Sequence, residues 1–235
     1  MARAGIPLLA VLIDADNSSP RWAEAIFEEI ASLGEASVRR IYGDFSRGQM
    51  SGWQDMLPKL ALVPHHQPAN TVGKNSSDIA LVIDAMDLLH SGRLDGFVLV
   101  SSDSDFTRLA SRIREQGLDV YGIGQQKTPE AFRKACKRFI FVENILPESE
   151  PEPGEKRGRM PPSKAVPLIK AAMMHIDKDE EWFSLGQLGQ FIVSANPDFD
   201  SRNYGCAKLS ELMARAGVFE LRKSAGNVMQ VRLKP

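Results

Sequence analysis

The chain has 235 residues, enough for one medium-sized domain and a second, smaller one. Its 29 Lys and Arg and 30 Asp and Glu give a formal net charge of -1, which excludes a strongly basic protein whose overall field attracts nucleic acid. Any nucleic-acid site must therefore be a local patch. The two cysteines, Cys136 and Cys206, lie far apart in the sequence, so we expect no disulfide framework or cysteine-based zinc site, and a reducing, cytoplasmic setting.

The first apolar run, at residues 6–13, follows Arg3 and has a faint likeness to a signal peptide. The run is short, lacks a small-residue cleavage site and ends in acids, so a buried strand is the better interpretation. No stretch of the sequence is long enough to span a bilayer, and no membrane association is predicted.

Strand and helix patterns alternate through the first part of the chain. Short apolar runs predict strands, the first buried on both faces, at residues 8–13, 37–42, 60–63, 97–100, 119–123 and 139–142. Apolar residues at helical spacing predict helices at residues 20–33, 77–90, 106–115 and 129–137. This alternation predicts an α/β fold, a parallel sheet flanked by helices, in which sites lie at the carboxyl ends of the strands.

Two of these helices carry more detailed expectations. The helix over residues 77–90 should have one apolar face, made of Ile79, Val82, Ile83, Met86 and either Leu89 or Leu88. Thr128 is expected to cap the helix over residues 129–137.

The composition changes at residues 147–162, whose sequence PESEPEPGEKRGRMPP is rich in proline and charge and has no apolar periodicity. We interpret this segment as a flexible linker between a domain at residues 1–146 and a small domain at residues 163–235. The small domain has three helical patterns, at 166–175, after Ser184 and from Ser201, then two short strands at 218–221 and 228–233. Three helices followed by a hairpin predict a winged helix-turn-helix.

Acidic residues follow two of the buried strands. The first strand ends in Asp14-Ala15-Asp16-Asn17, and the strand at 97–100 is followed by Asp103 and Asp105. A further acid, Asp78, opens the helix over residues 77–90. Since parallel strands present their carboxyl ends at one edge of the sheet, these acids are expected to meet there.

A cluster of carboxylates repels itself, and a divalent cation relieves the repulsion. Oxygen ligands select Mg²⁺ or Mn²⁺, ions that bind phosphate, lower the pKa of a bound water and stabilise a leaving oxygen. The structural alternatives are ordinary: Asp103 or Asp105 as a helix cap, Asp78 on a helix dipole, and Asp16 as a solvated side chain.

The motifs LIDADN, GKNSSDIALVIDAMDLL, LVSSDSDF, GLDVYGIG and TPEAFRKACKRFIFVENI resemble, in order, those of the NYN domain family of PIN-like nucleases, over residues 6–146. The resemblance implies a Rossmann-like (PIN-like) sheet and a metal-dependent ribonuclease, a hydrolase of RNA phosphodiester bonds. By the same resemblance, the catalytic residues are Asp14, Asn17, Asp78, Asp103 and Asp105. Asp14, Asp78 and Asp103 are the implied metal ligands. The family often has glycine at the position of Ser102, and a small residue remains there.

The tail, residues 163–235, is similar to the OST-HTH or LOTUS domain, a winged helix associated with RNA and with protein partners. Arg202, Lys208 and Arg215 are candidate phosphate contacts, as are Arg222 and Lys223, with scattered surface charge as the alternative. Trp182 and Phe183 suit either a core or a stacking platform, and the core is the favoured interpretation.

Several other residues of the first domain are candidate RNA contacts. Lys74 lies in the loop before Asp78, and Thr128 precedes a helix N-terminus, where phosphate binds readily. A local basic patch consists of Arg133, Lys134, Lys137 and Arg138, which as a rule would be only a solvated face.

Two rival functions remain open. The spacing Asp14-x-Asp16, with Ser18 after it, is also similar to haloacid-dehalogenase-type phosphatases, in which Asp14 would be the nucleophile. No convincing lysine motif precedes the later acid pair, which disfavours this family. The other rival is a non-catalytic RNA-binding adaptor of PIN-like fold, against which the full set of acids argues.

Overall fold

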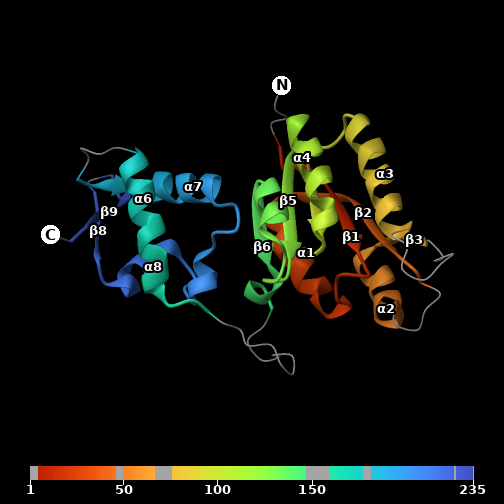
Figure 1. The fold of residues 1–235 in the computed structure, drawn as a ribbon, viewed down its shortest axis with the longest axis horizontal. Coiled ribbons are helices and arrows are strands. Elements are labelled where there is room, and N and C mark those ends of the chain that lie inside the picture. The colour runs from red at the N-terminus through yellow and green to blue at the C-terminus, as the bar shows by residue number, and fades with distance from the viewer. Residues whose placement is uncertain are drawn as a thin grey trace. The chain divides into compact units, whose positions relative to one another are not determined.

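The computed structural model describes residues 5–45, 50–66, 76–146, 159–176, 181–224 and 226–234. The chain divides into two compact units, residues 1–148 and 149–235 (Figure 1). In these described ranges, no helix has the length and apolar character needed to cross a membrane. Most of the predicted linker lies outside the described residues; within its remainder, the Met160 amide donates to the Asn203 carbonyl of the second unit.

The first unit is built on a six-stranded sheet in the order β3-β2-β1-β4-β5-β6, and every pairing is parallel. The strands are β1 (Leu8–Asp14), β2 (Glu35–Gly43), β3 (Val63–His66), β4 (Gly96–Val100), β5 (Asp119–Gly124) and β6 (Arg138–Phe141). The main helices between them are α1 (Ala23–Ala31), α2 (Ser51–Leu60), α3 (Ser76–His90), α4 (Thr107–Glu115) and α5 (Glu130–Ala135). The predicted parallel α/β fold is confirmed.

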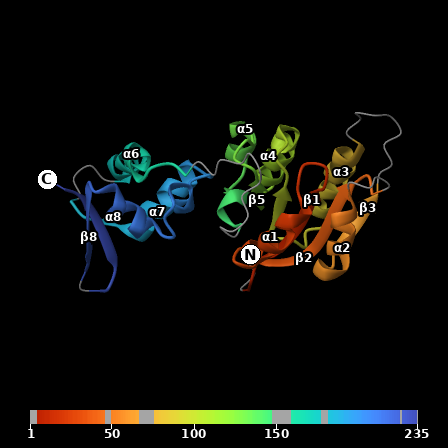
Figure 2. The ribbon, with the colours of Figure 1, turned by 90° about the horizontal axis from the view of Figure 1, so that it is seen from below.

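Helices cover both faces of this sheet (Figure 2). Side chains of α1 and α2 pack in one apolar cluster, and those of α3, α4 and α5 pack in another. The central strand β1 serves both, because Leu9, Val11 and Ile13 point to the first cluster and Ala10 and Leu12 to the second. The prediction that β1 is buried on both faces is confirmed.

The region around residue 60 differs from the prediction. Residues 51–60 form α2, although Pro58 lies inside the helix, and β3 starts only at Val63. Because proline usually interrupts a helix, α2 was not predicted from the sequence. The strand that follows contains Pro64 and is tolerated because it lies at the edge of the sheet.

The predicted apolar face of α3 is wrong in part: Val82, Met86 and Leu89 pack in the second apolar cluster, but Ile79 and Ile83 do not. The helix buries Leu81, Ala85 and Leu89, whereas Ile79 and Ile83 are 61% and 56% exposed. The helix is apolar on more than one side, so periodicity alone does not select the side that meets the sheet.

The second unit combines three helices with a small antiparallel sheet. Its elements are α6 (Val166–Ile176), β7 (Phe183–Ser184), α7 (Leu185–Ala195), α8 (Leu209–Ala216), β8 (Phe219–Lys223) and β9 (Met229–Leu233), with the strand order β7-β9-β8. The predicted helix from Ser201 is divided in two, a 3-10 turn at Ser201–Tyr204 and α8, because Gly205 between them has φ 68°. The arrangement matches the predicted small helix-turn-helix domain with a hairpin.

Candidate active site

The predicted acids gather where the strand order of the sheet reverses, between β1 and β4. Asp14 is the last residue of β1, and Asp103 and Asp105 follow β4 directly. Asp78 lies in the first turn of α3, the crossover helix between β3 and β4. A switch point of this kind opens a crevice at the carboxyl ends of the strands, because the neighbouring connections leave on opposite faces.

Asp14 is buried and fully engaged by hydrogen bonds. Its Oδ1 accepts from the backbone amides of Asp16 and Asn17 at 3.1 and 3.2 Å, and its Oδ2 accepts from Asn17 Nδ2 at 2.9 Å and Ser101 Oγ at 2.6 Å. Burial raises the pKa of Asp14, and the hydrogen bonds from Ser101 and Asn17 oppose that rise. Four donors on two oxygens hold this carboxylate in one orientation.

Ser101 links the two acid-bearing turns. Its hydroxyl donates to Asp14 and accepts from the Asp103 amide at 3.0 Å, so one buried side chain joins the ends of β1 and β4. The sequence interpretation missed Ser101, although a hydroxyl residue directly after a buried strand was a visible signal. Asp103 in turn accepts from the Asp105 amide through Oδ1 at 2.9 Å, so it caps the short helix that follows.

Asp78 is surrounded by like charges. Its pKa is raised to about 6, first by burial and then by repulsion from Asp14, Asp103, Asp16 and Asp105. Asp16, for which a solvated side chain was the structural alternative, is exposed and belongs to this cluster. Its Oδ2 accepts from Ser77 Oγ at 2.9 Å, which ties the end of β1 to the start of α3.

The donor set suits a hard divalent cation. The five carboxylates supply only oxygen, the ligand type preferred by Mg²⁺ and Mn²⁺, and a cation would relieve the repulsion recorded at Asp78. In the described ranges, no three His, Cys, Asp or Glu side chains are gathered closely enough to share one ion. The cluster is thus an acidic site with suitable chemistry rather than a finished coordination shell.

Thr128 lies beside this edge of the sheet. It is buried next to Gly124, the last residue of β5, where an added Cβ would lie 2.9 Å from Thr128 Oγ1 and 2.5 Å from the Ser101 carbonyl oxygen. The predicted capping role is wrong: Pro129 holds the cap position of α5, and Thr128 Oγ1 has no hydrogen-bond partner among the described residues.

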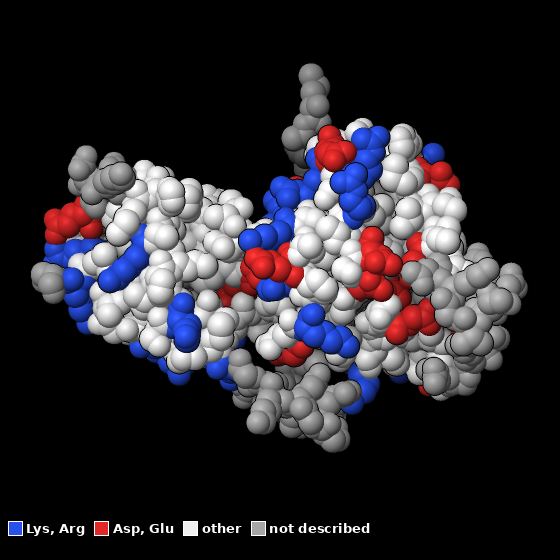
Figure 3. All heavy atoms as spheres, in the orientation of Figure 1, with Lys and Arg blue, Asp and Glu red and all other residues white. Residues whose placement is uncertain are grey.

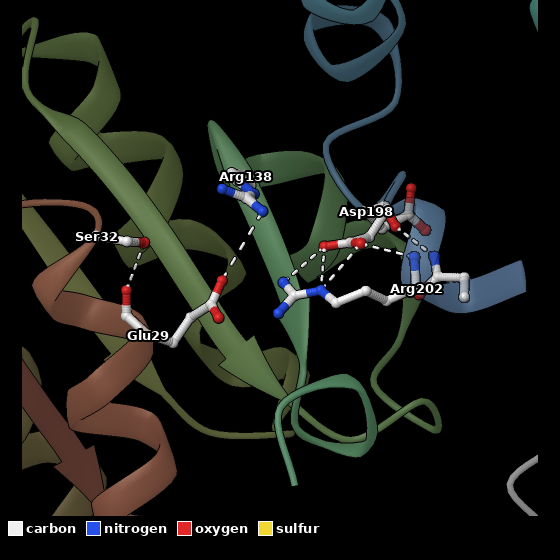
Figure 4. A network of polar contacts seen from close by, with 7 residues as sticks. Glu29, Ser32, Arg138, Asp198 and Arg202 are labelled. Atoms are coloured by element: carbon white, nitrogen blue, oxygen red, sulfur yellow. Dashed lines mark hydrogen bonds and ion pairs between the residues drawn. The ribbon is translucent and has the colours of Figure 1, made fainter. Parts of the chain in front are cut away.

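Part of the predicted basic patch lies away from the site. Lys137 and Arg138 lie at the amino end of β6, opposite the edge that carries the acids. Lys137 pairs with Asp119 at 2.6 Å, Arg138 approaches Glu29 of α1 at 3.9 Å (Figure 4), and Lys134 pairs with Glu130 at 2.7 Å. The guanidinium carbon of Arg133 lies 5.6 Å from the centre of the Phe141 ring. Lys74 lies outside the described residues.

The candidate phosphate contacts of the second unit are partly compensated. Arg202 makes a bidentate pair with Asp200, its Nη2 lying 2.7 Å from Oδ2. Arg215 donates to the Gly205 carbonyl at 2.8 Å and lies 3.6 Å from Glu211. Lys208 is exposed at the start of α8.

A second polar cluster lies on the same helix, away from the acids. Asp84 Oδ2 accepts from Tyr42 Oη at 2.8 Å and Arg40 Nη1 at 2.9 Å, and His65 Nδ1 lies 3.1 Å away. These three side chains can all donate a hydrogen bond to the Asp84 carboxylate. This cluster ties α3 to β2 and β3.

The comparisons agree with this architecture. The NYN domain model matches residues 8–145, and the OST-HTH/LOTUS domain model matches residues 159–230. No curated protein matches the chain. A crystal structure of a protein of unknown function from Vibrio parahaemolyticus is similar in fold, with a TM-score of 0.50 and 19% identity over 60% of this chain and 96% of that one.

A solution structure of an uncharacterised protein from Nitrosomonas europaea is 29% identical over 38% of this chain and 90% of that one, with a TM-score of 0.28. The NYN model covers more than half of the chain, from the start of β1 to residue 145, near the end of the first unit. The NYN domain indicates a nuclease-type fold, and the second domain indicates RNA binding. The chain is therefore a member of the NYN domain family that carries an OST-HTH/LOTUS domain after it.

Proposed function

We propose that the protein is a metal-dependent ribonuclease that hydrolyses RNA phosphodiester bonds at the aspartate cluster. The observation that carries the proposal is the convergence of Asp14, Asp78 and Asp103 at the switch point of an NYN-family sheet. Burial and the neighbouring carboxylates oppose the ionised form of Asp78, and a bound cation would compensate them. The OST-HTH/LOTUS domain would hold the RNA or recruit a protein partner.

The chain's own residues have distinct parts in this proposal. Asp14, Asp78 and Asp103 would hold Mg²⁺ or Mn²⁺, which supplies electrostatic stabilisation of the phosphate and a more acidic water. Asn17 and Ser101 position Asp14 through their hydrogen bonds. Asp105 and Asp16 are exposed at the rim, where their charges favour retention of a cation.

The phosphatase rival ranks lower on the sequence, because no convincing lysine motif precedes Asp103 and Asp105. A trapped aspartyl-phosphate on Asp14 would discriminate it from the nuclease.

A cytoplasmic location is part of the same proposal. Cys136 and Cys206 are both free and buried, as suits a reducing compartment.

Incubation of structured and unstructured RNA with Mg²⁺, Mn²⁺, Zn²⁺ or EDTA tests the proposal, with product ends resolved on a gel. We expect cleavage with Mg²⁺ or Mn²⁺, poor substitution by Zn²⁺ and none in EDTA. Asp103→Asn, prepared in parallel, controls for a contaminating nuclease. Full cleavage in EDTA would contradict the metal mechanism, and binding without cleavage under every condition would favour the adaptor.

A further inference from the structure

The small sheet of the OST-HTH/LOTUS domain has a buried face and an outer face. Phe183, Phe219 and Val231 point into the domain core. Alternation along the strands places their neighbours on the outer face, where Glu220 pairs with Arg232 and Arg222 with Gln230. Trp182, directly before β7, is only partly buried and lies on this side. The favoured core interpretation thus holds for Phe183 and fails for Trp182.

Two arginines stack on the Trp182 ring. The guanidinium carbon of Arg222 lies 3.8 Å from the ring centre, and that of Arg232 lies 4.6 Å from it. A guanidinium that stacks by its face keeps its N–H edges free for phosphate oxygens. Because stacking already restricts the side chain, less conformational entropy is lost when a ligand binds.

The two arginines differ in how far they are compensated. Arg232 donates from Nε to Glu220 at 2.7 Å and pairs with Glu181. Arg222 donates from Nε to the Gln230 amide oxygen at 3.0 Å, and in the described part of the chain it makes no ion pair. Arg222 is therefore the cation of this face that is most available to a ligand.

Charge separates this region from the rest of the molecule. Residues 218–234 contain four Lys and Arg and a single acid, Glu220. The first domain, residues 1–146, has sixteen Lys and Arg against eighteen Asp and Glu. On the face drawn in Figure 3, acidic side chains gather on the first unit, while Lys and Arg predominate on the second. The hairpin thus complements a polyanion.

We propose that this outer face, made of Trp182, Glu220, Arg222, Gln230 and Arg232, binds single-stranded RNA. The inference rests on the proposed function and names the RNA-binding surface of its second domain. Planar side chains on an open sheet suit stacked bases, and the arginine edges suit the phosphates between them. The excess of positive charge on the hairpin favours nucleic acid over a protein partner.

The test measures binding of a fluorescent oligouridylate of about 12 nucleotides by anisotropy, with the full chain in EDTA. All proteins carry Asp103→Asn, so that the RNA stays intact. Trp182→Leu and Arg222→Gln should each weaken binding about tenfold. Trp182→Phe keeps an aromatic ring, and Lys164→Gln removes one exposed cation from the start of the domain. Both should bind within about twofold of the parent, if stacking at this face decides affinity.

The outcomes separate this inference from the proposed function. Parental affinity in both Trp182→Leu and Arg222→Gln overturns the RNA surface, and a protein partner then becomes the better occupant. Equal loss in Lys164→Gln and Arg222→Gln overturns it too, since general charge would explain the binding. Thermal unfolding checks that the Trp182 variants fold, and the exposed Arg222 variant decides the question if they do not. Cleavage by the unmodified protein is measured separately and tests the nuclease alone.

Discussion

Two aspartates of α3, Asp78 and Asp84, lie less than two turns apart and have opposite surroundings. Asp84 accepts hydrogen bonds from Tyr42 and Arg40 and lies beside His65, so its charge is compensated. Asp78 is partly buried and lies near four other carboxylates, and these two effects raise its pKa to about 6. One acid holds the fold together, whereas the other opposes it. An acid that opposes folding is a candidate for function, because only a ligand makes its charge favourable.

The largest expected effect comes from removing the uncompensated charge. Asp78→Asn and Asp103→Asn should each lower the rate of RNA cleavage by at least about two orders of magnitude, comparable to loss of a main electrostatic contribution. The thermal midpoint should stay level or rise, because carboxylate repulsion falls. Gel-based cleavage rates and thermal unfolding measure the two effects. If both variants cleave normally, the cluster is structural, and Asp103 serves only as the cap.

Removal of Asp84, the compensated acid, should lower stability and leave cleavage almost unchanged. Asp84→Ala leaves the buried Tyr42 hydroxyl and the Arg40 guanidinium without their acceptor, so we expect a loss of about 1–3 kcal/mol in the free energy of unfolding. At temperatures where the variant is folded, cleavage should stay within a few-fold of the parent. Urea unfolding gives the stability, with Asp78→Asn as the matched change on the same helix. A stable but inactive Asp84→Ala protein would place Asp84 in the catalytic machinery.

Separation of the two domains tests their division of labour. A fragment of residues 1–146 should fold and keep the acid cluster, which lies entirely within the first unit. If the second domain only holds RNA, the fragment should show a KM raised roughly tenfold on long RNA and a nearly unchanged kcat.

The KM difference should shrink on RNA too short to reach both domains, and at high salt. Steady-state kinetics of both proteins measure this. Equal KM values on long RNA would indicate a domain that recruits protein, and a collapse of kcat would show that the second domain helps to form the active site.

The smallest effect concerns pH. The pKa of Asp78 rises from 3.8 to about 6 on folding, so between these values the folded state binds more protons than the unfolded state. The contribution of Asp78 to stability therefore falls as pH rises through this window and is constant above it. In EDTA, Asp78→Asn should gain stability over the parent from about pH 4 to about pH 6, and the gain should then level off. If the stability difference between Asp78→Asn and the parent narrows as pH rises, the charge of Asp78 is compensated in the folded state.

Much of the first domain was predictable because its signals are local. A strand buried on both faces needs a continuous apolar run, as in β1, and the acids at strand ends are visible as soon as the strands are assigned. The crowding of Asp14, Asp78 and Asp103 agrees with that prediction, while their catalytic and metal-binding roles stay predictions. A hydroxyl residue after β4 was visible in the sequence, but its hydrogen bond to Asp14, 87 positions away, depends on side-chain orientations that only the folded structure fixes.

The sequence alone determined the type of most main elements, with α2 as an exception, together with the two-domain order and the acids that follow the strands, because periodicity and strand ends depend on neighbouring residues. Tertiary structure alone decided the contacts that strand order does not imply. It turned Ile79 and Ile83 outward, since α3 has several apolar sides, and it carried Lys137 and Arg138 to the edge opposite the acids. It also placed Trp182 under two arginines, because the pairing of β7 with β9 sets which alternate residues face outward.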